Sequence, residues 1–305
     1  MRPTTREEFE VAIICALPHE ADAVKASFDE TYDTHSHYYS KRPGDINVYT
    51  NGRIEQHNVV LCHLPNMGKG SAAVVASNLR MSYPGVQLAL VVGICGAVPV
   101  SKDGVKIALG DVIISDSLVE YDIGRQYPDG FQRKNDAKSM FGRPSLEIRT
   151  VLASLRTLDI GEQFQERIHY HFKALQARKP VWENPSTSLH HESLHEKEKD
   201  SQILQSGLHE DTPGPALHIG TMASADTVMK SDTHRDELAH SEGIIGFEME
   251  GPGVWDIFPC LIIKGVCDYA DSQKNKLFQN YAAATGAAGA KAFLSHWRSN
   301  IRKGM

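Results

Sequence analysis

The segment LIIKGVCDYAD, residues 261–271, combines the two features that decide the fold and the position of the site. Its first seven residues are mostly apolar and partly β-branched, which is typical of a strand covered on both faces of a sheet. Asp268 follows this run directly, and Asp271 comes three residues later. The carboxyl ends of strands are where open α/β sheets bind their ligands. The segment therefore predicts a buried strand with a polar site at its end.

Five further apolar runs have the same character, and several are followed by stretches that are compatible with a helix. They cover residues 11–17, 58–64, 88–93, 111–118 and 244–248. Residues 70–80 and 280–294 are rich in Ala and Leu and predict helices. Strands that alternate with helices indicate an α/β fold.

The middle of the chain has a different composition. Residues 145–177 predict two amphipathic helices, whereas residues 182–215 contain almost no large apolar side chains. We expect the second stretch to be a flexible insertion. At 305 residues the chain is near the upper size of a single core, so residues 1–305 are predicted to form one domain.

Composition limits the class of protein. Hydrophobic residues make up 41% and charged residues 23% of the chain, which is ordinary for a globular protein. The net charge of −6 gives no global attraction to nucleic acid or to an anionic membrane, so neither is expected as a partner. The sequence has no long apolar run and no signal-peptide core at its start, which predicts a cytoplasmic protein. The five cysteines have no metal-type spacing and are expected to be reduced core thiols.

One motif suggests a metal. His191, Glu192 and His195 form an HExxH pattern, which on a helix places two imidazoles one turn apart, as in zinc proteases. The pattern lies inside the polar stretch 182–215, where no apolar face would bury such a helix. We therefore predict a solvated, histidine-rich loop, with no metal and no cofactor.

Two glycine turns are candidates for ligand contact. Residues 67–71 (MGKGS) resemble a phosphate loop, but Gly70 stands where that loop requires Ser or Thr after Lys69. A simple turn that opens a helix and a helix N-terminus that binds a polar ligand both fit this segment. Gly93 and Ile94 begin the turn GICGA at the end of an apolar run, where glycine permits close backbone approach.

Acids end two other apolar runs as well. Glu248 and Glu250 come at the end of one run. Ser224 and Asp226 follow another. With Asp268 they predict a polar cleft at one edge of the sheet, although each acid alone could cap a helix for about 1 kcal/mol.

Taken together, six segments resemble the superfamily of nucleoside phosphorylases and methylthioadenosine/S-adenosylhomocysteine nucleosidases. The nearest likeness is to the nucleosidase-like domains that fungi place at the head of ankyrin, tetratricopeptide or NACHT-containing proteins. The segments are VAIICALPHE (11–20), VGICGA (92–97), YDIGRQYP (121–128), ASADTVM (223–229), FEMEG (247–251) and GVCDYAD (265–271). The resemblance implies a single-domain nucleoside phosphorylase-like α/β fold with a central mixed, partly barrel-like sheet flanked by helices. It also implies assembly as a homo-oligomer, usually a dimer, trimer or hexamer.

The resemblance further implies how the site works. Glu250 is similar to the residue that holds the ribose hydroxyls, Met249 to the one that packs on the sugar, and Asp268 to the acid that protonates purine N7. Such general-acid catalysis is worth about 10²–10⁴-fold, because negative charge develops on the departing purine. Apolar walls from Ile94 and Phe247 would keep the site dry.

The nucleophile distinguishes hydrolysis from phosphorolysis. In the nucleosidase branch a glutamate after the first strand activates water, and Glu20 holds that position here. A carboxylate deprotonates water and repels phosphate, which favours hydrolysis, although Glu20 could also simply stabilise a helix N-terminus. Arg125, Lys69 and Arg80 are cations that could bind phosphate as a nucleophile, or the 5′-phosphates of a nucleotide such as ATP.

We therefore predict a purine nucleosidase that hydrolyses the N-glycosidic bond of adenosine-type nucleosides or nucleotides, ATP among them. A purine nucleoside phosphorylase and a non-catalytic nucleoside sensor are the alternatives. The predicted catalytic residues are Asp268, Glu20 and Glu250. The predicted substrate-binding residues are Met249, Glu248, Phe247, Gly93, Ile94, Ser224, Asp226, Arg125 and Lys69.

Overall fold

The centre of the fold is a sheet that closes on itself. The computed structural model describes residues 2–33, 39–134, 140–185, 214–274 and 276–298. The ring consists, in order, of β11 (Ile244–Glu248), β10 (Leu217–Ser224), β6 (Val112–Glu120), β12 (Cys260–Asp268) and β5 (Leu88–Ala97). A short antiparallel pairing between β5 and β11 completes the ring, while β6 and β12 are also antiparallel and the other neighbours are parallel. The predicted mixed, partly barrel-like sheet is thus confirmed.

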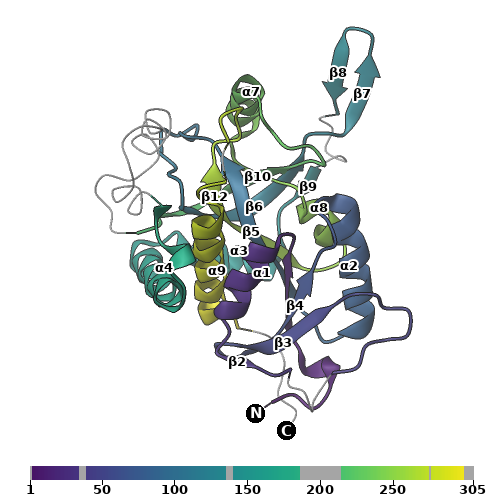
Figure 1. Cartoon of the computed structure of the whole chain (residues 1–305). Coiled ribbons are helices and arrows are strands. Elements are labelled where there is room, and N and C mark those ends of the chain that lie inside the picture. Colours follow the sequence, from purple (N-terminus) through teal and green to yellow (C-terminus); the bar gives the residue numbers. More distant parts are fainter. Residues whose placement is uncertain (1, 34–38, 135–139, 186–213, 275, 299–305) are drawn as a thin grey trace.

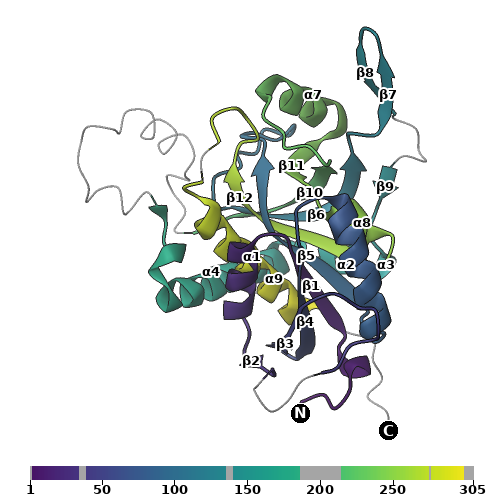
Figure 2. The same cartoon turned by 45° about the vertical axis from the view of Figure 1, so that its right-hand side comes forward.

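Further strands extend the sheet beyond β5. They are β1 (Val11–Cys15), β4 (His57–His63), β3 (Tyr49–Ile54) and β2 (Glu30–Thr31), while β9 (Met140–Gly142) pairs with β6. The two strands nearest to β5, β1 and β4, are almost entirely buried because their side chains are covered on both faces. β7 (Gly124–Tyr127) and β8 (Gly130–Arg133) form a separate hairpin that projects from the rest of the molecule (Figures 1 and 2).

Helices cover the sheet on opposite sides. They are α1 (Pro18–Ala26), α2 (Lys69–Ser82), α3 (Leu146–Leu155), α4 (Leu158–Arg178), α7 (Asp232–Glu242), α8 (Gly251–Trp255) and α9 (Gln279–His296), with short 3₁₀ turns η1 (Arg6–Glu8) and η2 (Pro180–Trp182). α9 packs on β12 and β5 and is covered by α4, whereas α2 packs against α8 on another side of the barrel (Figures 1 and 2).

Small residues allow α9 to approach the barrel closely. Most of this helix is buried, and its inner positions are largely alanine and glycine. Gly265 of β12 faces it so closely that a Cβ at this position would lie 1.9 Å from the carbonyl oxygen of Ala282. Glycine is therefore required where β12 meets α9.

The first residue of the predicted insertion 182–215, which follows α4, is buried in the structure. Trp182 lies at the start of the predicted insertion 182–215, yet its side chain is 2% exposed and belongs to η2, which packs on α4 and α9. The prediction is wrong at this residue because a single large apolar side chain anchors an otherwise polar stretch. Residues 186–213 lie outside the described part of the chain, so the flexible insertion stays a prediction there.

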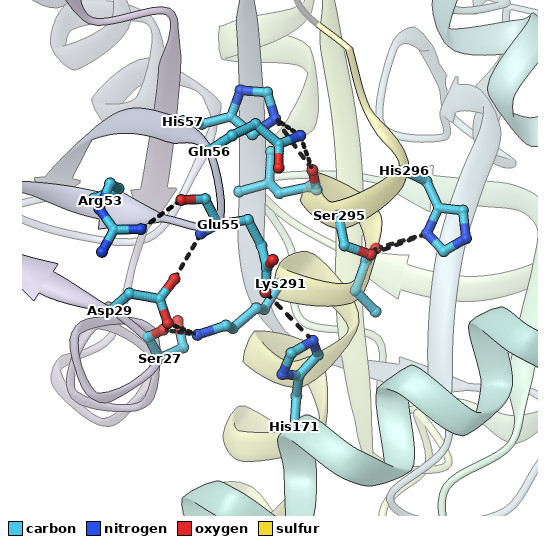
Figure 3. Close-up of polar contacts among 12 residues, drawn as sticks. Ser27, Asp29, Arg53, Glu55, Gln56, His57, His171, Lys291, Ser295 and His296 are labelled. Carbon is cyan, nitrogen blue, oxygen red and sulfur yellow. Dashed lines mark hydrogen bonds and ion pairs between the residues drawn. The ribbon is translucent and has the colours of Figure 1, made fainter. Parts of the chain in front are cut away.

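A polar junction around Lys291 connects α9 to the end of α1, to α4 and to the turn between β3 and β4 (Figure 3). The Nζ atom of Lys291 donates to the carbonyl oxygen of Ser27 at 2.8 Å and to Oδ1 of Asp29 at 2.5 Å. Asp29 in turn accepts the backbone N–H of Glu55 at 2.6 Å. His171 of α4 lies 3.8 Å from the Glu55 carboxylate. Burial, and then the charge of Lys291, lower the pKa of His171 to about 4, so this imidazole is neutral near neutral pH.

Two sequence predictions concern the cysteines and the possibility of membrane-spanning segments. All five cysteines are buried and free, as expected for core thiols. None of the helices in the described segments is both long enough and apolar enough to cross a membrane.

Candidate active site

A pocket opens where the carboxyl ends of β5, β11 and β12 converge. Gly96 of β5 pairs both with Phe247 of β11 and with Asp268 of β12, because the ring closes at this point. The pocket is lined by seven of the predicted residues: Glu20, Ile94, Phe247, Glu248, Met249, Glu250 and Asp268. The closure of the barrel therefore brings together side chains that are far apart in the sequence.

Glu20 is held rigidly at one wall of the pocket. It is the third residue of α1, and its Oε2 accepts the backbone N–H groups of Ala16 and Leu17 at 2.9 and 2.8 Å. Its Oε1 accepts the N–H of Ile94 at 2.8 Å. The helix-stabilising role considered from the sequence is thus present, and the same carboxylate also faces the pocket. Burial raises the pKa of Glu20, while the Lys264 ammonium opposes this rise.

Gly93 contributes by having no side chain. A Cβ on Gly93 would lie 2.1 Å from Oε1 of Glu20, so any larger residue would displace the carboxylate. Gly93 lies behind Glu20 rather than in the pocket lining. Gly93 lies inside β5 rather than in the turn expected there, and its missing side chain permits the close approach of a protein carboxylate.

Glu250 forms a buried ion pair with a lysine that the sequence analysis did not single out. The Nζ atom of Lys264, in β12, lies 3.0 Å from Oε2 of Glu250, and both side chains are almost completely buried. Burial alone would lower the pKa of Lys264, but the charges of Glu250, Glu20 and Glu248 raise it well above its ordinary value. Lys264 therefore stays charged and compensates a group of buried carboxylates.

Glu248 has a structural task. Its carboxylate accepts the backbone N–H groups of Glu250 and Gly251, with a shortest distance of 2.9 Å to each, and so caps the start of α8. Burial raises the pKa of Glu248, and the charge of Lys264 opposes this rise. Ser224 is buried beside Glu248, since the two are paired in register between β10 and β11. Glu248 lines the pocket, whereas Ser224 lies behind it.

Asp268 lines the pocket from the end of β12. Its Oδ1 accepts the backbone N–H of Ala270 at 2.8 Å and lies 3.1 Å from Nζ of Lys274. Its Oδ2 is 3.2 Å from Sγ of Cys267. The two carboxylate oxygens thus have unequal surroundings, because Oδ1 has two strong donors and Oδ2 only a weak thiol donor.

Besides Gly93 and Ser224, three more of the predicted ligand contacts lie outside the pocket lining. Lys69 is bound by two carboxylates, with Nζ 2.8 Å from Glu120 and 2.7 Å from Asp122. Asp226 accepts the backbone N–H of Lys69 at 2.7 Å, so this acid fixes the start of α2. Arg125 is exposed on the projecting β7–β8 hairpin (Figure 1).

Arg80 also lies away from the site. Its guanidinium is 5.2 Å from the ring centroid of Phe258 and donates to the carbonyl oxygen of Val86 at 3.5 Å. These contacts fit a residue that fastens the end of α2 to the barrel.

Several lining residues were not predicted. Tyr121 at the end of β6 lines the pocket, packs edge-on against Phe247 and donates its hydroxyl to the carbonyl oxygen of Thr227 at 3.0 Å. Met67 and Lys274 line it as well.

A lysine inside an apolar strand, as Lys264 is, was a usable signal, because a buried cation needs anionic partners. Lys274 carried no such signal, since it comes from a polar connection.

The predicted absence of a metal remains a prediction. Within the described residues, no group of three or more His, Cys, Asp or Glu side chains is arranged to hold a metal ion. His191 and His195 of the HExxH pattern lie outside that part of the chain.

The fold of this protein, a closed mixed sheet flanked by helices, is shared with solved structures. The 5′-methylthioadenosine/S-adenosylhomocysteine nucleosidase of Streptococcus pneumoniae, solved in complex with 8-aminoadenine, superimposes with a TM-score of 0.59 at 20% identity, covering 95% of this chain and 100% of that one. The chain belongs to the phosphorylase superfamily, whose family model matches residues 10–295.

Two relatives illustrate the range of the family. A nucleotide-binding leucine-rich repeat (NLR)-like protein of Hyaloscypha variabilis is 32% identical over 94% of this chain, which spans only 29% of that relative's length. A 5′-methylthioadenosine/S-adenosylhomocysteine nucleosidase of Mycobacterium bovis is 21% identical, and the match covers 93% of this chain and 95% of the relative.

Proposed function

We propose that this protein is a purine nucleosidase that hydrolyses the N-glycosidic bond of adenosine-type nucleosides or nucleotides. The observation that carries the proposal is the placement of Glu20, Glu250 and Asp268 around one pocket with apolar walls. Cleavage of this bond produces positive charge on the sugar and negative charge on the base. A site that presents carboxylates to the sugar and a proton donor to the base stabilises both.

In this mechanism Asp268 acts on the leaving base. Its carboxyl group, protonated on Oδ2, gives that proton to N7 as the C1′–N9 bond breaks and its electron pair moves into the purine. Oδ2 suits this role because Oδ1 is already held by Ala270 and Lys274. Glu250 accepts hydrogen bonds from the ribose hydroxyls, and its anchoring by Lys264 fixes its orientation.

Glu20 activates the water that attacks C1′. Each carboxylate oxygen has two lone-pair sites, so Glu20 can still accept a proton from water despite its three backbone donors. Burial raises the pKa of Glu20, which makes the carboxylate a stronger base near neutral pH.

The charges around the pocket favour water over phosphate as the nucleophile. Besides the proton donor Asp268, three carboxylates line it, from Glu20, Glu248 and Glu250, and Lys274 is the cation among the described lining residues. An inorganic phosphate ion would be repelled by this excess of negative charge. Lys69 is one of the three cations that the sequence suggested for phosphate, and it is already neutralised by Glu120 and Asp122. The other two, Arg125 and Arg80, lie outside the pocket lining.

The substrate class rests on the proteins to which this chain is similar. The names of two relatives, both methylthioadenosine/S-adenosylhomocysteine nucleosidases, support an adenosine-type substrate. Nucleotides, ATP among them, belong to the same proposal, as does assembly into a homo-oligomer. We place the reaction in the cytoplasm.

Product analysis tests this proposal directly. The purified chain is incubated with adenosine, methylthioadenosine and ATP, each with and without inorganic phosphate, and the products are separated by chromatography. We expect free adenine and a ribose product in phosphate-free buffer from at least one substrate. Asp268→Asn, which removes the proton donor and keeps the shape of the side chain, is the matched blank and should release no adenine.

Other outcomes identify the alternatives. Strict dependence on phosphate with ribose 1-phosphate as product would make the protein a phosphorylase. Binding of nucleosides without any product under either condition would make it a sensor.

A further inference from the structure

We propose that Lys274 widens the base specificity of the site, so that 6-oxopurine nucleosides such as inosine are cleaved as well as adenosine. This inference rests on the proposed nucleosidase function and concerns the base end of the same pocket. It follows from the hydrogen-bonding groups that Asp268 and Lys274 present together.

The two classes of purine differ along the edge that carries N7. Adenine presents an acceptor at N7 and a donor at its 6-amino group, whereas 6-oxopurines present acceptors at both positions. A lone carboxyl group complements adenine, because one oxygen donates a proton to N7 and the other accepts from the amino group. A 6-oxopurine needs a second donor in place of that acceptor. A site without one leaves the 6-oxygen unpaired, and such a mismatch is costly in a buried site.

Asp268 is not a lone carboxyl group in this protein. Its Oδ1, the oxygen that would accept from a 6-amino group, already receives the N–H of Ala270 at 2.8 Å and lies 3.1 Å from the Lys274 ammonium. Gly96 leaves room for this arrangement, because a Cβ at its position would lie 2.8 Å from the same Oδ1 atom. The acceptor that adenine would use is therefore largely committed to protein donors.

Lys274 supplies the missing donor. Its side chain lines the pocket next to Asp268 and is 18% exposed, so the ammonium is partly withdrawn from water. An ammonium has three N–H donors, and among the described residues one of them meets Oδ1 of Asp268. It can donate to a 6-oxygen while Asp268 protonates N7. Because the stem is long and flexible, Lys274 can turn away when a 6-amino group occupies the same place.

The test compares inosine with adenosine in the wild-type chain and in Lys274→Met. We expect the wild type to cleave both nucleosides. The substitution removes the charged donor, so kcat/KM for inosine should fall by about 10- to 100-fold more than kcat/KM for adenosine. The Kd of free hypoxanthine, measured by calorimetry, should rise relative to that of free adenine.

Lys276→Met is the matched control, because Lys276 is exposed, lies two residues away and is not part of the pocket lining. It should leave the inosine-to-adenosine ratio as in the wild type. If the wild type cleaves adenosine but not inosine, or if Lys274→Met leaves the ratio unchanged, the inference is wrong and the nucleosidase function stands. If the wild type cleaves neither nucleoside nor any other purine substrate, the function itself fails.

Discussion

At the scale of single residues, Lys264 has the largest electrostatic role in the site. Its ammonium is almost completely buried and pairs with Glu250, and it also opposes the negative charges of Glu20 and Glu248. Removing one partner of a buried ion pair leaves charge uncompensated, which costs far more than an exposed pair contributes.

Lys264→Met should therefore weaken both stability and catalysis. We expect the free energy of unfolding, measured by urea denaturation, to fall by about 3–5 kcal/mol. Without the cation the pKa of Glu20 rises further, so this base stays protonated up to a higher pH. The ascending limb of the kcat/KM pH profile should then move to higher pH.

The exposed Lys25 on α1 provides the control, since Lys25→Met removes a charge without uncovering a buried carboxylate. Its unfolding free energy and pH profile should match those of the wild type. An unchanged ascending limb in Lys264→Met would mean that Glu20 is not the titrating base.

The residues of the site were predictable to different degrees. Glu20, Glu250 and Asp268 stand at the ends of apolar runs, where the pattern itself draws attention to a charge, and the structure places all three in one pocket. Their catalytic roles stay a prediction. Lys69 and Arg125 could not be judged, because a cation in a sequence does not reveal whether carboxylates already neutralise it or whether it lies on a projecting hairpin.

At the scale of elements, the contact between β12 and α9 depends on the absence of a single methyl group. Gly265→Ala would place a Cβ 1.9 Å from a backbone carbonyl of α9. Backbone cannot move aside as a flexible side chain does, so strand and helix must separate. We expect a loss of about 3 kcal/mol in the free energy of unfolding by chemical denaturation.

Gly70→Ala is the matched control for this change. Gly70 lies in the first turn of α2, and a Cβ there would meet nothing within 4 Å. Alanine is the better helix former, so this variant should be more stable than the wild type by about 0.5–1 kcal/mol. Equal stability of the two variants would contradict a close β12–α9 contact.

The elements themselves were largely visible in the sequence, whereas their arrangement was predicted only through the resemblance to a known family. The apolar runs at residues 244–248 and 261–266 became β11 and β12, and the Ala-rich run at 280–294 became α9. The pairing of β5 with β11, which closes the ring, depends on the twist of the whole sheet, and nothing local encodes it. β3 was missed because its residues YTNGRI lack a continuous apolar run.

At the scale of the whole molecule, the polar junction around Lys291 makes stability depend on pH through His171. The imidazole has an ordinary pKa of 6.5 and a pKa of about 4 in the folded protein. Between these values the unfolded chain binds a proton that the folded chain does not. The free energy of unfolding must therefore fall as the pH drops from 6.5 to 4, by a total of the order of 3 kcal/mol from this group.

His171→Gln should remove this part of the acid sensitivity. Urea unfolding at pH 7 and pH 4.5 should show a smaller loss of stability in His171→Gln than in the wild type. His240→Gln, at an exposed position on α7, is the control and should behave as the wild type does. The same loss in all three chains would refute a buried, neutral His171.

The closure of the barrel between β5 and β11 also sets the moment at which the protein first becomes active. Glu20 belongs to α1 and Asp268 ends β12, so a ribosome must deliver all the residues between them before the two can face each other. In the proposed mechanism, a nascent or truncated chain that lacks β12 would hold the base Glu20 without the acid Asp268. Cleavage of the glycosidic bond would thus report that all residues from α1 to β12 have been synthesised and folded together.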